Sequence, residues 1–476
     1  MPLKRSEKTP MPERTPLDRV RDFFEVNEGY RLDHAAFEAE RCLRCQDPVC
    51  IEGCPVNIPI PDFIHAIAAH NMPEAARLLR TANPLPAICG RVCPQEVQCE
   101  MLCHMTNRFR PVAIGALERF VADWERDQPV EQISGESTDK PARPARKEKV
   151  AVIGAGPAGL VCAGELARLG YSVTVYEGLH APGGVLRYGI PEFRLPKDIL
   201  DWEIDMLKRS GVEIVCNVII GKTLTLDQLF DEFGFSAVFI GSGAGLPQFL
   251  GIPGENLNGV LSANEFLTRI NLMRAYAFPE SDTPLHLGKR VAVIGAGNTA
   301  MDAVRSSLRM GAEEGHIVYR RSEKEMTARI EEHHHAIEEG VQFHWLTNPI
   351  EILGDDEGWV TGLKCVRMEL GEPDESGRAR PIPIPDSEFV LPMDNVVLAV
   401  GTTPNPLLVK SAAGLETTPK GCFVAEETSG RTTRRRVYAG GDAVTGAATV
   451  ILAAGAGKRA AEAIHADLNE DAGRED

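Results

Sequence analysis

A short β-branched strand, a glycine-rich turn and a small-residue helix follow one another twice in this chain of 476 residues. Small residues fill the three motif positions of each copy: Gly154, Gly156 and Gly159 in KVAVIGAGPAGLVCAGEL, and Gly295, Gly297 and Ala300, with Asn298, in KRVAVIGAGNTAMDAV. These glycines permit a tight turn and close approach of a pyrophosphate, and the helix N-terminus offers partial positive charge to phosphates. The repeat therefore predicts two Rossmann-type α/β domains that bind two dinucleotides.

The residues after the second strand of each copy differ in charge and predict different nucleotides. Glu177 follows the first glycine turn by about twenty residues, where a carboxylate can hydrogen-bond ribose hydroxyls. Arg320 and Arg321 occupy the equivalent place in the second copy, where guanidinium groups can bind a 2′-phosphate that a carboxylate would repel. The second copy is therefore predicted to bind NADP(H) rather than NAD(H); the alternative is that both arginines merely face solvent.

A third glycine-containing turn, VYAGGDAVTG, places Gly441 and Asp442 between a predicted strand and a small-residue helix. An aspartate at this turn can accept hydrogen bonds from a polyol chain, and the helix N-terminus can lie near a phosphate. Turns favour both residue types, so the pair alone is a weak signal. Its place after two Rossmann units makes it a candidate part of a nucleotide site.

Eight of the 12 cysteines are concentrated in two runs before residue 104. The runs are Cys42-x2-Cys45-x4-Cys50-x3-Cys54-Pro55 and Cys89-x3-Cys93-Pro94-x4-Cys99-x3-Cys103. Three close thiolates can bind one [4Fe-4S] cubane while the cysteine before a proline reaches a second cluster, as in two-cluster ferredoxins. The spacing therefore predicts two [4Fe-4S] clusters, with tetrahedral zinc as the alternative that also fits a CxxC pair.

Helical periodicity, with Pro61 and Pro73 near helix starts, predicts a small helical domain around the cysteines over residues 1–126. Residues 127–148 are rich in proline, serine and charge and predict a linker. His333, His334 and His335 lie in a charged helical stretch and are expected to be surface residues rather than ligands. Hydrolase signatures such as GxSxG and HExxH are absent from the sequence.

The net charge and the apolar content of the chain argue against two classes of binding partner, nucleic acids and membranes. The net charge of −17 does not suit a nucleic-acid backbone, whose binding needs clustered lysine and arginine. No run approaches the roughly 18 apolar residues of a membrane span, and the polar N-terminus lacks the apolar segment of a signal peptide. The sequence therefore predicts a cytoplasmic protein that binds neither nucleic acid nor a membrane.

The GAGPAGL turn, Glu177, the repeated unit and the AGGDA segment together resemble the flavoprotein disulfide reductase fold. The resemblance implies FAD in the first site, with Asp442 at the ribityl chain, and NADPH in the second. It also implies FAD-binding segments at 149–285 and 402–476 around an NADPH-binding domain at 286–401. No CxxxxC pair follows the first Rossmann helix, so electrons are expected to leave through the N-terminal cysteines.

Nearly the whole chain resembles the small (β) subunit of NADPH-dependent glutamate synthase and its relatives. Matching segments are CGRVCPQE at 89–96, APGGVLRYGIPEFRLPK at 181–197 and VYRRSEKEMTAR at 318–329. The second of these adds Gly184 and Arg187 to the residues expected to bind FAD. Residues 241–273 look closer to one branch, which includes homotetrameric glutamate synthase, the large subunit of NADH-dependent reduced ferredoxin:NADP oxidoreductase and the sulfide dehydrogenase alpha subunit.

In relatives with this cysteine pattern, such as dihydropyrimidine dehydrogenase, the cluster ligands interleave between the two runs. The resemblance then implies one cluster on Cys42, Cys45, Cys50 and Cys103, and three corners of the other on Cys54, Cys93 and Cys99. The fourth corner in those relatives is not a cysteine, and the matching position here is Glu118. Cys89 is then a spare thiol, whereas the competing assignment gives that corner to Cys89.

The resemblance implies electron transfer from NADPH through FAD and the clusters, without covalent catalysis by the protein. The first function it implies is the NADPH-oxidising subunit of a glutamate synthase, whose large subunit forms L-glutamate from glutamine and 2-oxoglutarate. The second is the large subunit of a ferredoxin:NADP transhydrogenase, with a small flavoprotein as partner and ferredoxin as a further candidate. A third, from a different class, is a zinc-stabilised interaction module that does not turn over.

Overall fold

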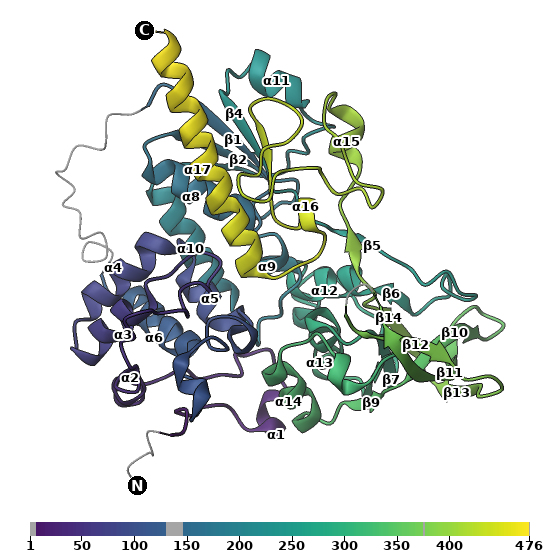
Figure 1. Cartoon of the computed structure of the whole chain (residues 1–476). Helices are drawn as coiled ribbons and strands as arrows, with labels where there is room; N and C mark the ends of the chain where they lie inside the picture. The colour runs from purple at the N-terminus through teal and green to yellow at the C-terminus, as the bar shows by residue number, and fades with distance from the viewer. Residues whose placement is uncertain (1–5, 130–145, 375–376, 476) are drawn as a thin grey trace.

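The computed structural model describes residues 6–129, 146–374 and 377–475. An N-terminal group of helices lies beside two parallel β-sheets, and the long C-terminal helix runs along the first of them (Figure 1). The predicted helical domain followed by two Rossmann-type units is confirmed. Of the predicted linker, residues 130–145 lie outside the described residues. None of the helices in the described ranges is long and apolar enough to cross a membrane.

The first sheet has five parallel strands in the order β16-β4-β1-β2-β3. Its elements are β1 (Lys149–Ile153), α8 (Pro157–Arg168), β2 (Ser172–Tyr176), α9 (Val185–Tyr188), α10 (Lys197–Arg209), β3 (Val212–Val215), α11 (Leu226–Asp231), β4 (Ala237–Ile240), α15 (Leu407–Ser411), β16 (Val437–Ala439), α16 (Asp442–Thr445) and α17 (Val450–Glu475). Val150 and Val152 face the core shared with α8 and α17, whereas Ala151 and Ile153 face the core that includes α11. Burial on both faces explains why β1 is an unbroken apolar run.

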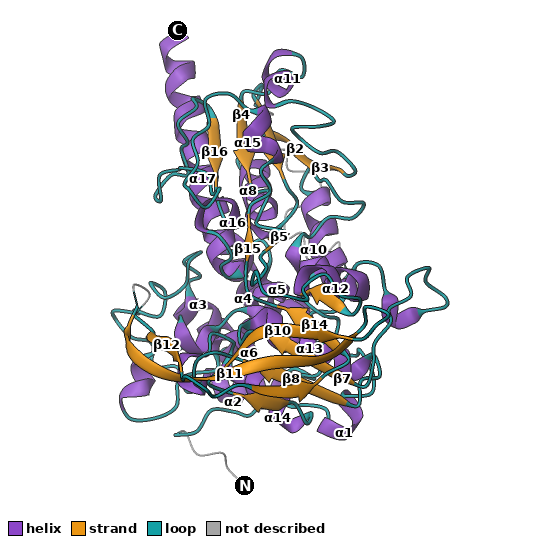
Figure 2. Cartoon of the chain, turned by 90° about the vertical axis from the view of Figure 1, so that its right-hand side faces the viewer, coloured by secondary structure: helices purple, strands orange, loops and turns teal. Residues whose placement is uncertain are grey.

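The second sheet also has five parallel strands, in the order β6-β14-β7-β8-β9. Its middle strands β14, β7 and β8 lie below the first sheet in Figure 2. Its elements are β6 (Val260–Ser262), α12 (Ala263–Asn271), β7 (Arg290–Ile294), α13 (Asn298–Arg309), β8 (Glu314–Val318), α14 (Ile330–Glu338), β9 (Gln342–His344) and β14 (Asn395–Leu398). The pairing of β6 with β14 places residues before 286 in this sheet. We therefore propose that the second domain begins between β4 and β6, in place of residue 286.

Two further groups of strands belong to neither parallel sheet. β5 (Leu246–Pro247) and β15 (Thr402–Thr403) pair antiparallel where the chain passes between the two sheets. β10 (Thr347–Gly354), β11 (Val360–Pro373), β12 (Ala379–Pro383) and β13 (Phe389–Pro392) form an antiparallel sheet on the outer side of the second domain (Figure 1). At the start of β12, the Ala379 carbonyl accepts a hydrogen bond from Arg321, which follows β8, and the preceding Arg378 lines the nucleotide cavity described below.

The N-terminal domain consists of short helices joined by cysteine-containing loops. They are α1 (Pro16–Arg19), α2 (Leu32–Ala39), α3 (Ile60–Ala68), α4 (Met72–Ala82), α5 (Pro86–Val92) and α6 (Ile114–Arg126), with 3-10 turns at Gln95–Val97 and His104–Asn107. Pro61 and Pro73 occupy the first turns of α3 and α4, as predicted, where their missing N–H costs no helical hydrogen bond. The Asn71 side chain accepts a hydrogen bond from the Glu74 N–H and caps α4.

Buried ion pairs join the three parts of the chain. Arg194, between α9 and α10, lies 2.9 Å from Glu332 of α14. Arg305 of α13 pairs with Glu332 and, at 2.7 Å, with Glu339, which also lies 3.1 Å from Arg19 of α1. Burial alone would raise the pKa of Glu339, but Arg305 and the neighbouring guanidinium groups hold it well below its usual range.

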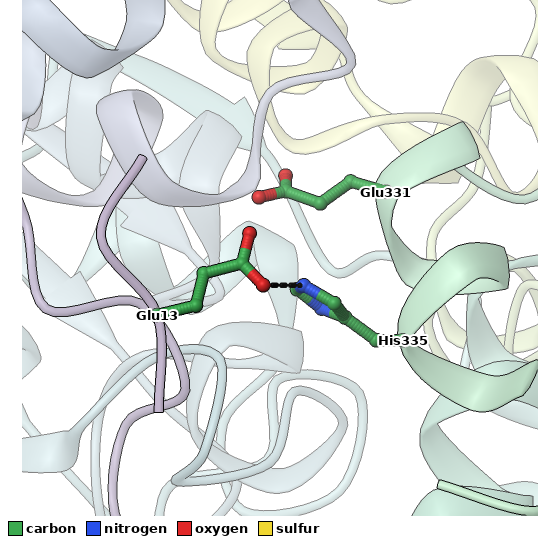
Figure 3. A group of neighbouring side chains, drawn as sticks. All are labelled: Glu13, Glu331 and His335. Carbon is green, nitrogen blue, oxygen red and sulfur yellow. Dashed lines mark hydrogen bonds and ion pairs between the residues drawn. The ribbon is translucent and has the colours of Figure 1, made fainter. Parts of the chain in front are cut away.

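The same interface includes a smaller cluster in which the N-terminal segment meets α14 (Figure 3). His335 Nε2 lies 3.0 Å from the Glu13 carboxylate, and Glu331 lies beside them. Arg19 lies 3.2 Å from Glu13 and Arg329 lies 2.7 Å from Glu331, so a guanidinium group already balances each carboxylate. The cluster therefore serves to hold two segments together, and its charges do not favour a metal cation.

The prediction that the histidine triplet lies on the surface is wrong for two of its members. His333 and His335 are each 4% exposed, and only His334 is exposed. Adjacent residues of a helix point in different directions, and here the N-terminal segment and the strands around Phe343 cover the two faces that carry His335 and His333. The charged sequence around the triplet does not reveal this covering segment.

Replacing Arg305 by methionine is expected to lower the free energy of unfolding by about 3–5 kcal/mol, because Glu332 and Glu339 would each lose a buried partner. The measurement is a thermal or urea unfolding curve of the purified chain. Arg77→Met is the matched control, since Arg77 pairs with Glu74 on an exposed helix face and surface pairs contribute little. Equal unfolding midpoints for the two variants would contradict the importance of the buried network.

Candidate functional site

One cavity of about 1330 Å³ lies between the two parallel sheets. It is lined by the segments that follow the carboxyl ends of β1, β4, β7 and β14, together with the N-terminal ends of α8 and α17. Ligands of open α/β sheets bind outside the carboxyl ends of the strands, and helix N-termini favour phosphates. The cavity is therefore the candidate site for both predicted dinucleotides.

The first glycine turn has the shape that a pyrophosphate requires. Gly154 has φ of +98°, and a Cβ on Gly159 would lie 1.9 Å from the Gly154 carbonyl oxygen, so the turn and the helix pack without side chains. A Cβ on Gly156 would meet nothing within 4 Å, because this position faces the cavity. Gly184, with φ of +53°, packs on the Gly156 backbone and also lines the cavity. These positions fit a bound dinucleotide.

Glu177 lies at the cavity wall with both carboxylate oxygens held. Oε2 accepts a hydrogen bond from the Ala155 N–H at 2.8 Å, and Oε1 accepts one from the Leu179 N–H at 2.9 Å. These two bonds orient the carboxylate and leave further lone pairs for ribose hydroxyls. Glu177 therefore lies at the cavity wall, and its role in binding ribose hydroxyls stays a prediction.

At the other end of the first site, Asp442 begins α16 and lines the cavity, while Gly441 has φ of +65° and packs against Ala158 and Ala453. Burial raises the pKa of Asp442 to about 6, although its carboxylate accepts a hydrogen bond from the Ala448 N–H. The carboxylate is therefore mainly ionised at neutral pH, and it lies at the cavity wall.

Arg187, a predicted FAD residue, does not line the cavity, and neither do Gly159 and Gly441, which pack against neighbouring backbone and alanine side chains. The Arg187 guanidinium pairs with Asp201 and donates to the Pro182 carbonyl at 2.6 Å, and its side chain is outside the cavity lining. The short α9 turns this side chain toward α10 instead. Arg187 therefore holds the loop that carries Gly184, which faces the cavity.

The second glycine turn repeats the geometry of the first. Gly295 has φ of +132°, and a Cβ there would lie 2.4 Å from the Ala399 carbonyl oxygen. Ala300 is fully buried in the contact between helix and sheet. Gly297 and Asn298 line the cavity, and Asn298 Oδ1 accepts a hydrogen bond from the Arg329 N–H at 2.9 Å. This turn also fits a pyrophosphate.

The two arginines predicted to bind a 2′-phosphate have different surroundings. Both line the cavity, but Arg320 is exposed, whereas Arg321 is 4% exposed. Arg321 pairs with Asp374 and donates to the Ala379 carbonyl at 2.8 Å, so it fastens the loop between β11 and β12. Arg378 from that loop lines the same end of the cavity, and the sequence pattern did not reveal it. The cationic end of the cavity is thus assembled from two distant segments.

The first cysteine group, Cys42, Cys45, Cys50 and Cys103, lines a small separate cavity in the helical domain. Burial and the neighbouring thiols raise the pKa of Cys50 to about 12. Leu43 and Leu102 line the same cavity and are 60% and 38% exposed, so this group lies near the surface. The structure thus brings together the four residues that the resemblance assigns to one cluster.

The second group, Cys54, Cys93 and Cys99, is buried, with Glu118 5% exposed beside it. Burial raises the pKa of Glu118 to about 8, opposed by the hydrogen bond that Asn83 Nδ2 donates at 3.1 Å. The charge of Glu118 raises the pKa of all three thiols. Glu118 is therefore a common neighbour of the three, as a fourth ligand must be.

Cys89 is the largest cause of the raised pKa of Cys93, ahead of burial, so the two thiols are close neighbours. Two ligands at different corners of a cubane are separated by the cluster itself, so a thiol in contact with Cys93 is poorly placed for another corner. This geometry favours Glu118 over Cys89 as the fourth ligand.

Thiol spacing bears on the choice between a cubane and zinc. Within the described residues, Glu13, Glu331 and His335 are the one group of three or more potential ligands whose atoms all lie within 4.8 Å of one another. Four thiolates on one zinc ion, each at about 2.3 Å, would lie about 3.8 Å apart. Both cysteine groups are therefore more open than a zinc site, and their all-thiol or thiol-carboxylate composition fits a larger cluster.

The second cysteine group adjoins the nucleotide cavity. Val92 and Pro94, on either side of Cys93, line that cavity. Three cysteines of the first group come from the same sequence run as Cys54. The first group nevertheless lies farther toward the surface, beside the exposed Leu43 and Leu102. The two groups thus lead from the cavity between the sheets to the outside of the helical domain.

Two family models match the chain. One, described as dihydropyrimidine dehydrogenase domain II, 4Fe-4S cluster, matches residues 19–130, and the other, pyridine nucleotide-disulphide oxidoreductase, matches residues 148–463. The first model covers both cysteine groups and Glu118. A zinc-stabilised module accordingly has no support from the comparisons.

Three curated proteins show how far the similarity extends. The glutamate synthase (NADPH) small chain of Halomonas elongata is 39% identical over 464 residues, which is 95% of both chains. The corresponding chain of Escherichia coli K12 is 36% identical, over 95% of this chain and 96% of its own. The β subunit of the NADP(+)-dependent formate dehydrogenase of Moorella thermoacetica is 40% identical over 88% of this chain, which spans only 60% of that longer protein.

Solved structures share the fold of the two sheet domains. Mycobacterium tuberculosis FprA in complex with NADPH superposes with a TM-score of 0.57 at 21% identity, over 68% of this chain and 85% of that one. Thioredoxin reductase of Lactococcus lactis gives 0.51 at 22% identity, over 68% of this chain and 100% of that one. At this identity the likeness shows the arrangement of the two nucleotide-binding units alone.

Proposed function

Because the chain belongs to the glutamate synthase small-chain family, and is thus an NADPH-dependent flavin and iron–sulfur oxidoreductase, we propose that it is the electron-supplying subunit of a glutamate synthase. In this proposal, electrons from NADPH reach two [4Fe-4S] clusters through FAD and leave to a large partner subunit, which forms L-glutamate from glutamine and 2-oxoglutarate. The full-length match to two small chains supports this choice, since the formate dehydrogenase subunit is a longer protein.

The observation that carries the proposal is the position of the second cysteine group at the wall of the nucleotide cavity. Val92, the last residue of α5, and Pro94 flank Cys93 and line the cavity, so this part of the second group adjoins the cavity wall. The first group lies farther out, beside the exposed Leu43. This order supplies a route from a bound flavin to the protein surface.

Each proposed cofactor has its own set of binding residues. Gly154, Gly156, Glu177 and Asp442 would hold FAD, and Gly295, Gly297, Asn298 and Arg320 would hold NADPH. Cys42, Cys45, Cys50 and Cys103 would hold one cluster, and Cys54, Cys93, Cys99 and Glu118 the other. When bound, FAD supplies the conversion of the electron pair of NADPH into single-electron transfers. The chain binds, orients and separates these groups, and no side chain has to act as an acid or base.

Some relatives have names that indicate other electron acceptors, and they suggest alternatives to the proposed glutamate synthase function. A protein named NADPH-Fe(3+) oxidoreductase subunit beta, from Geobacter sulfurreducens, is 38% identical over 88% of this chain, and this chain spans 64% of it. Such relatives are subunits of multi-subunit oxidoreductases, so the partner decides the reaction. The large subunit of a ferredoxin:NADP transhydrogenase and the sulfide dehydrogenase alpha subunit are the alternatives within the family.

The test is an anaerobic pull-down of the tagged, full-length chain from its native host, followed by assay of the purified complex. We expect a large glutamine amidotransferase chain to co-purify, and the complex to form glutamate only when NADPH, glutamine and 2-oxoglutarate are all present. A complex with a small flavin and [2Fe-2S] protein that reduces ferredoxin, without glutamate formation, would overturn the proposal. The chain with Cys45→Ser is the control, because its cavity is intact but the outer cysteine group is not.

A further inference from the structure

Lys458 links two domains through its side chain. It lies on α17, the C-terminal helix of the first sheet domain, and its Nζ donates to the Val56 carbonyl at 2.8 Å and to the Ala82 carbonyl at 2.9 Å. Both carbonyls belong to the helical domain, 402 and 376 residues away in sequence. One ammonium group thus spans the interface and fastens both the turn at Val56 and the C-terminal end of α4.

Each of these two segments lies next to a candidate ligand of the second cluster or next to a residue that orients one. Val56 lies two residues after Cys54. Ala82 directly precedes Asn83, which is fully buried and donates to Glu118 Oε1 at 3.1 Å. Lys458 therefore fixes the loop of one candidate ligand and the loop that orients another.

The helix that carries Lys458 also touches the nucleotide cavity. Val450 and Ala453, near its N-terminal end, line that cavity. One turn later, a Cβ on Gly455 would lie 2.6 Å from the carbonyl oxygen of Pro55, the residue after Cys54. The backbone of α17 therefore packs directly on the cysteine loop, and a rigid helix connects the wall of the cavity to the second cysteine group.

We propose that Lys458 is a positioning residue for electron transfer, which sets both the placement and the reduction potential of the second cluster. This inference rests on the proposed function, in which that cluster receives electrons at the cavity wall. Reduction adds negative charge to a cluster, so a nearby cation raises the reduction potential, while hydrogen bonds that fix the backbone beside the ligands set the placement of the cluster. Lys458 supplies both, from a domain that does not itself hold the cluster.

The experiment is a reductive titration of the holoprotein followed by electron paramagnetic resonance, which reports each cluster separately from turnover. Lys458→Met removes the charge and both hydrogen bonds. We expect the second cluster to become harder to reduce, with the electron distribution between flavin and cluster shifted about tenfold, which is 59 mV for a one-electron couple. The first cluster should keep its potential, and Lys458→Arg, which keeps the charge and donors, should restore the second.

Lys420→Met is the matched control, because Lys420 is an exposed lysine of the same domain and its loss changes the net charge equally. If Lys458→Met does not accumulate as holoprotein, Lys458→Gln removes the charge while it keeps a donor. Equal potentials in the Lys458 and Lys420 variants would overturn the role of Lys458 and leave the proposed function intact. A wild-type protein with only one cluster signal would instead refute the proposed function, since its electron route needs both groups.

Discussion

Replacing Arg320 by glutamate is expected to raise the KM for NADPH about a hundredfold while the KM for NADH stays nearly unchanged. Arg320 is exposed at the end of the cavity where the 2′-phosphate would lie, next to Arg378. A hydrogen bond to a charged group is worth about 1.5–3 kcal/mol, and the new carboxylate adds repulsion, so a loss near 3 kcal/mol corresponds to two powers of ten. Steady-state kinetics with both coenzymes measures this change.

Calorimetry can compare the affinity for 2′,5′-ADP with the affinity for 5′-AMP, and it tests the 2′-phosphate assignment without enzyme turnover. Arg209→Glu is the control for net charge, because Arg209 is exposed at the end of α10 and away from the cavity lining. Arg321→Met should affect NADPH less than Arg320→Glu does, since Arg321 is committed to Asp374 and the Ala379 carbonyl. An unchanged preference for NADPH in Arg320→Glu would refute the 2′-phosphate assignment.

The difference between Arg320 and Arg321 shows what a sequence pattern cannot contain. The spacing from the second glycine turn correctly places both residues at the cavity. The partner of Arg321 is Asp374, 53 residues later, in an antiparallel insertion that carries no motif. Sequence periodicity predicts local elements, whereas the choice of a partner across such a distance depends on how an insertion folds back.

Elements buried on both faces were the most predictable. β1 (Lys149–Ile153) and β2 (Ser172–Tyr176) stand before and after the first glycine turn and its helix, as predicted, because apolar runs between turn residues mark central parallel strands. β6 (Val260–Ser262) is three residues long and lies before the boundary that was expected at residue 286. A strand of that length has too few residues for a periodic pattern, and its place is set by pairing with β14.

The sequence and the family resemblance predict which cysteines lie together, but they do not predict which other residues hold the surrounding loops in place. Spacing and family resemblance bring Cys42 and Cys103 together although 61 positions separate them, and the structure places both at one cavity. Asn83 and Lys458, which hold the surroundings of the second group, have no recognisable spacing. Their roles follow from tertiary packing of loops against α17, which only the structure reveals.

Replacing Glu118 by alanine is expected to remove one of two clusters, so the iron content of the purified chain should fall by about half. Glu118 is buried beside Cys54, Cys93 and Cys99, and its charge acts on all three thiols. With three thiolates and no fourth ligand, a [4Fe-4S] cluster has an open corner and is readily lost. Iron analysis and electron paramagnetic resonance of anaerobically purified protein measure the loss.

Cys89→Ala decides between the two assignments. If Glu118 is the eighth ligand, the Cys89 variant keeps both clusters and the full iron content, because Cys89 only contacts Cys93. Cys54→Ser should lose the second cluster under either assignment and therefore serves as the positive control. Loss of a cluster in Cys89→Ala together with full iron in Glu118→Ala would reverse the ligand assignment. In whichever variant loses the second cluster, NADPH should still reduce the flavin, because Gly156, Glu177 and Asp442 are untouched, whereas electron delivery to the outer cysteine group should stop.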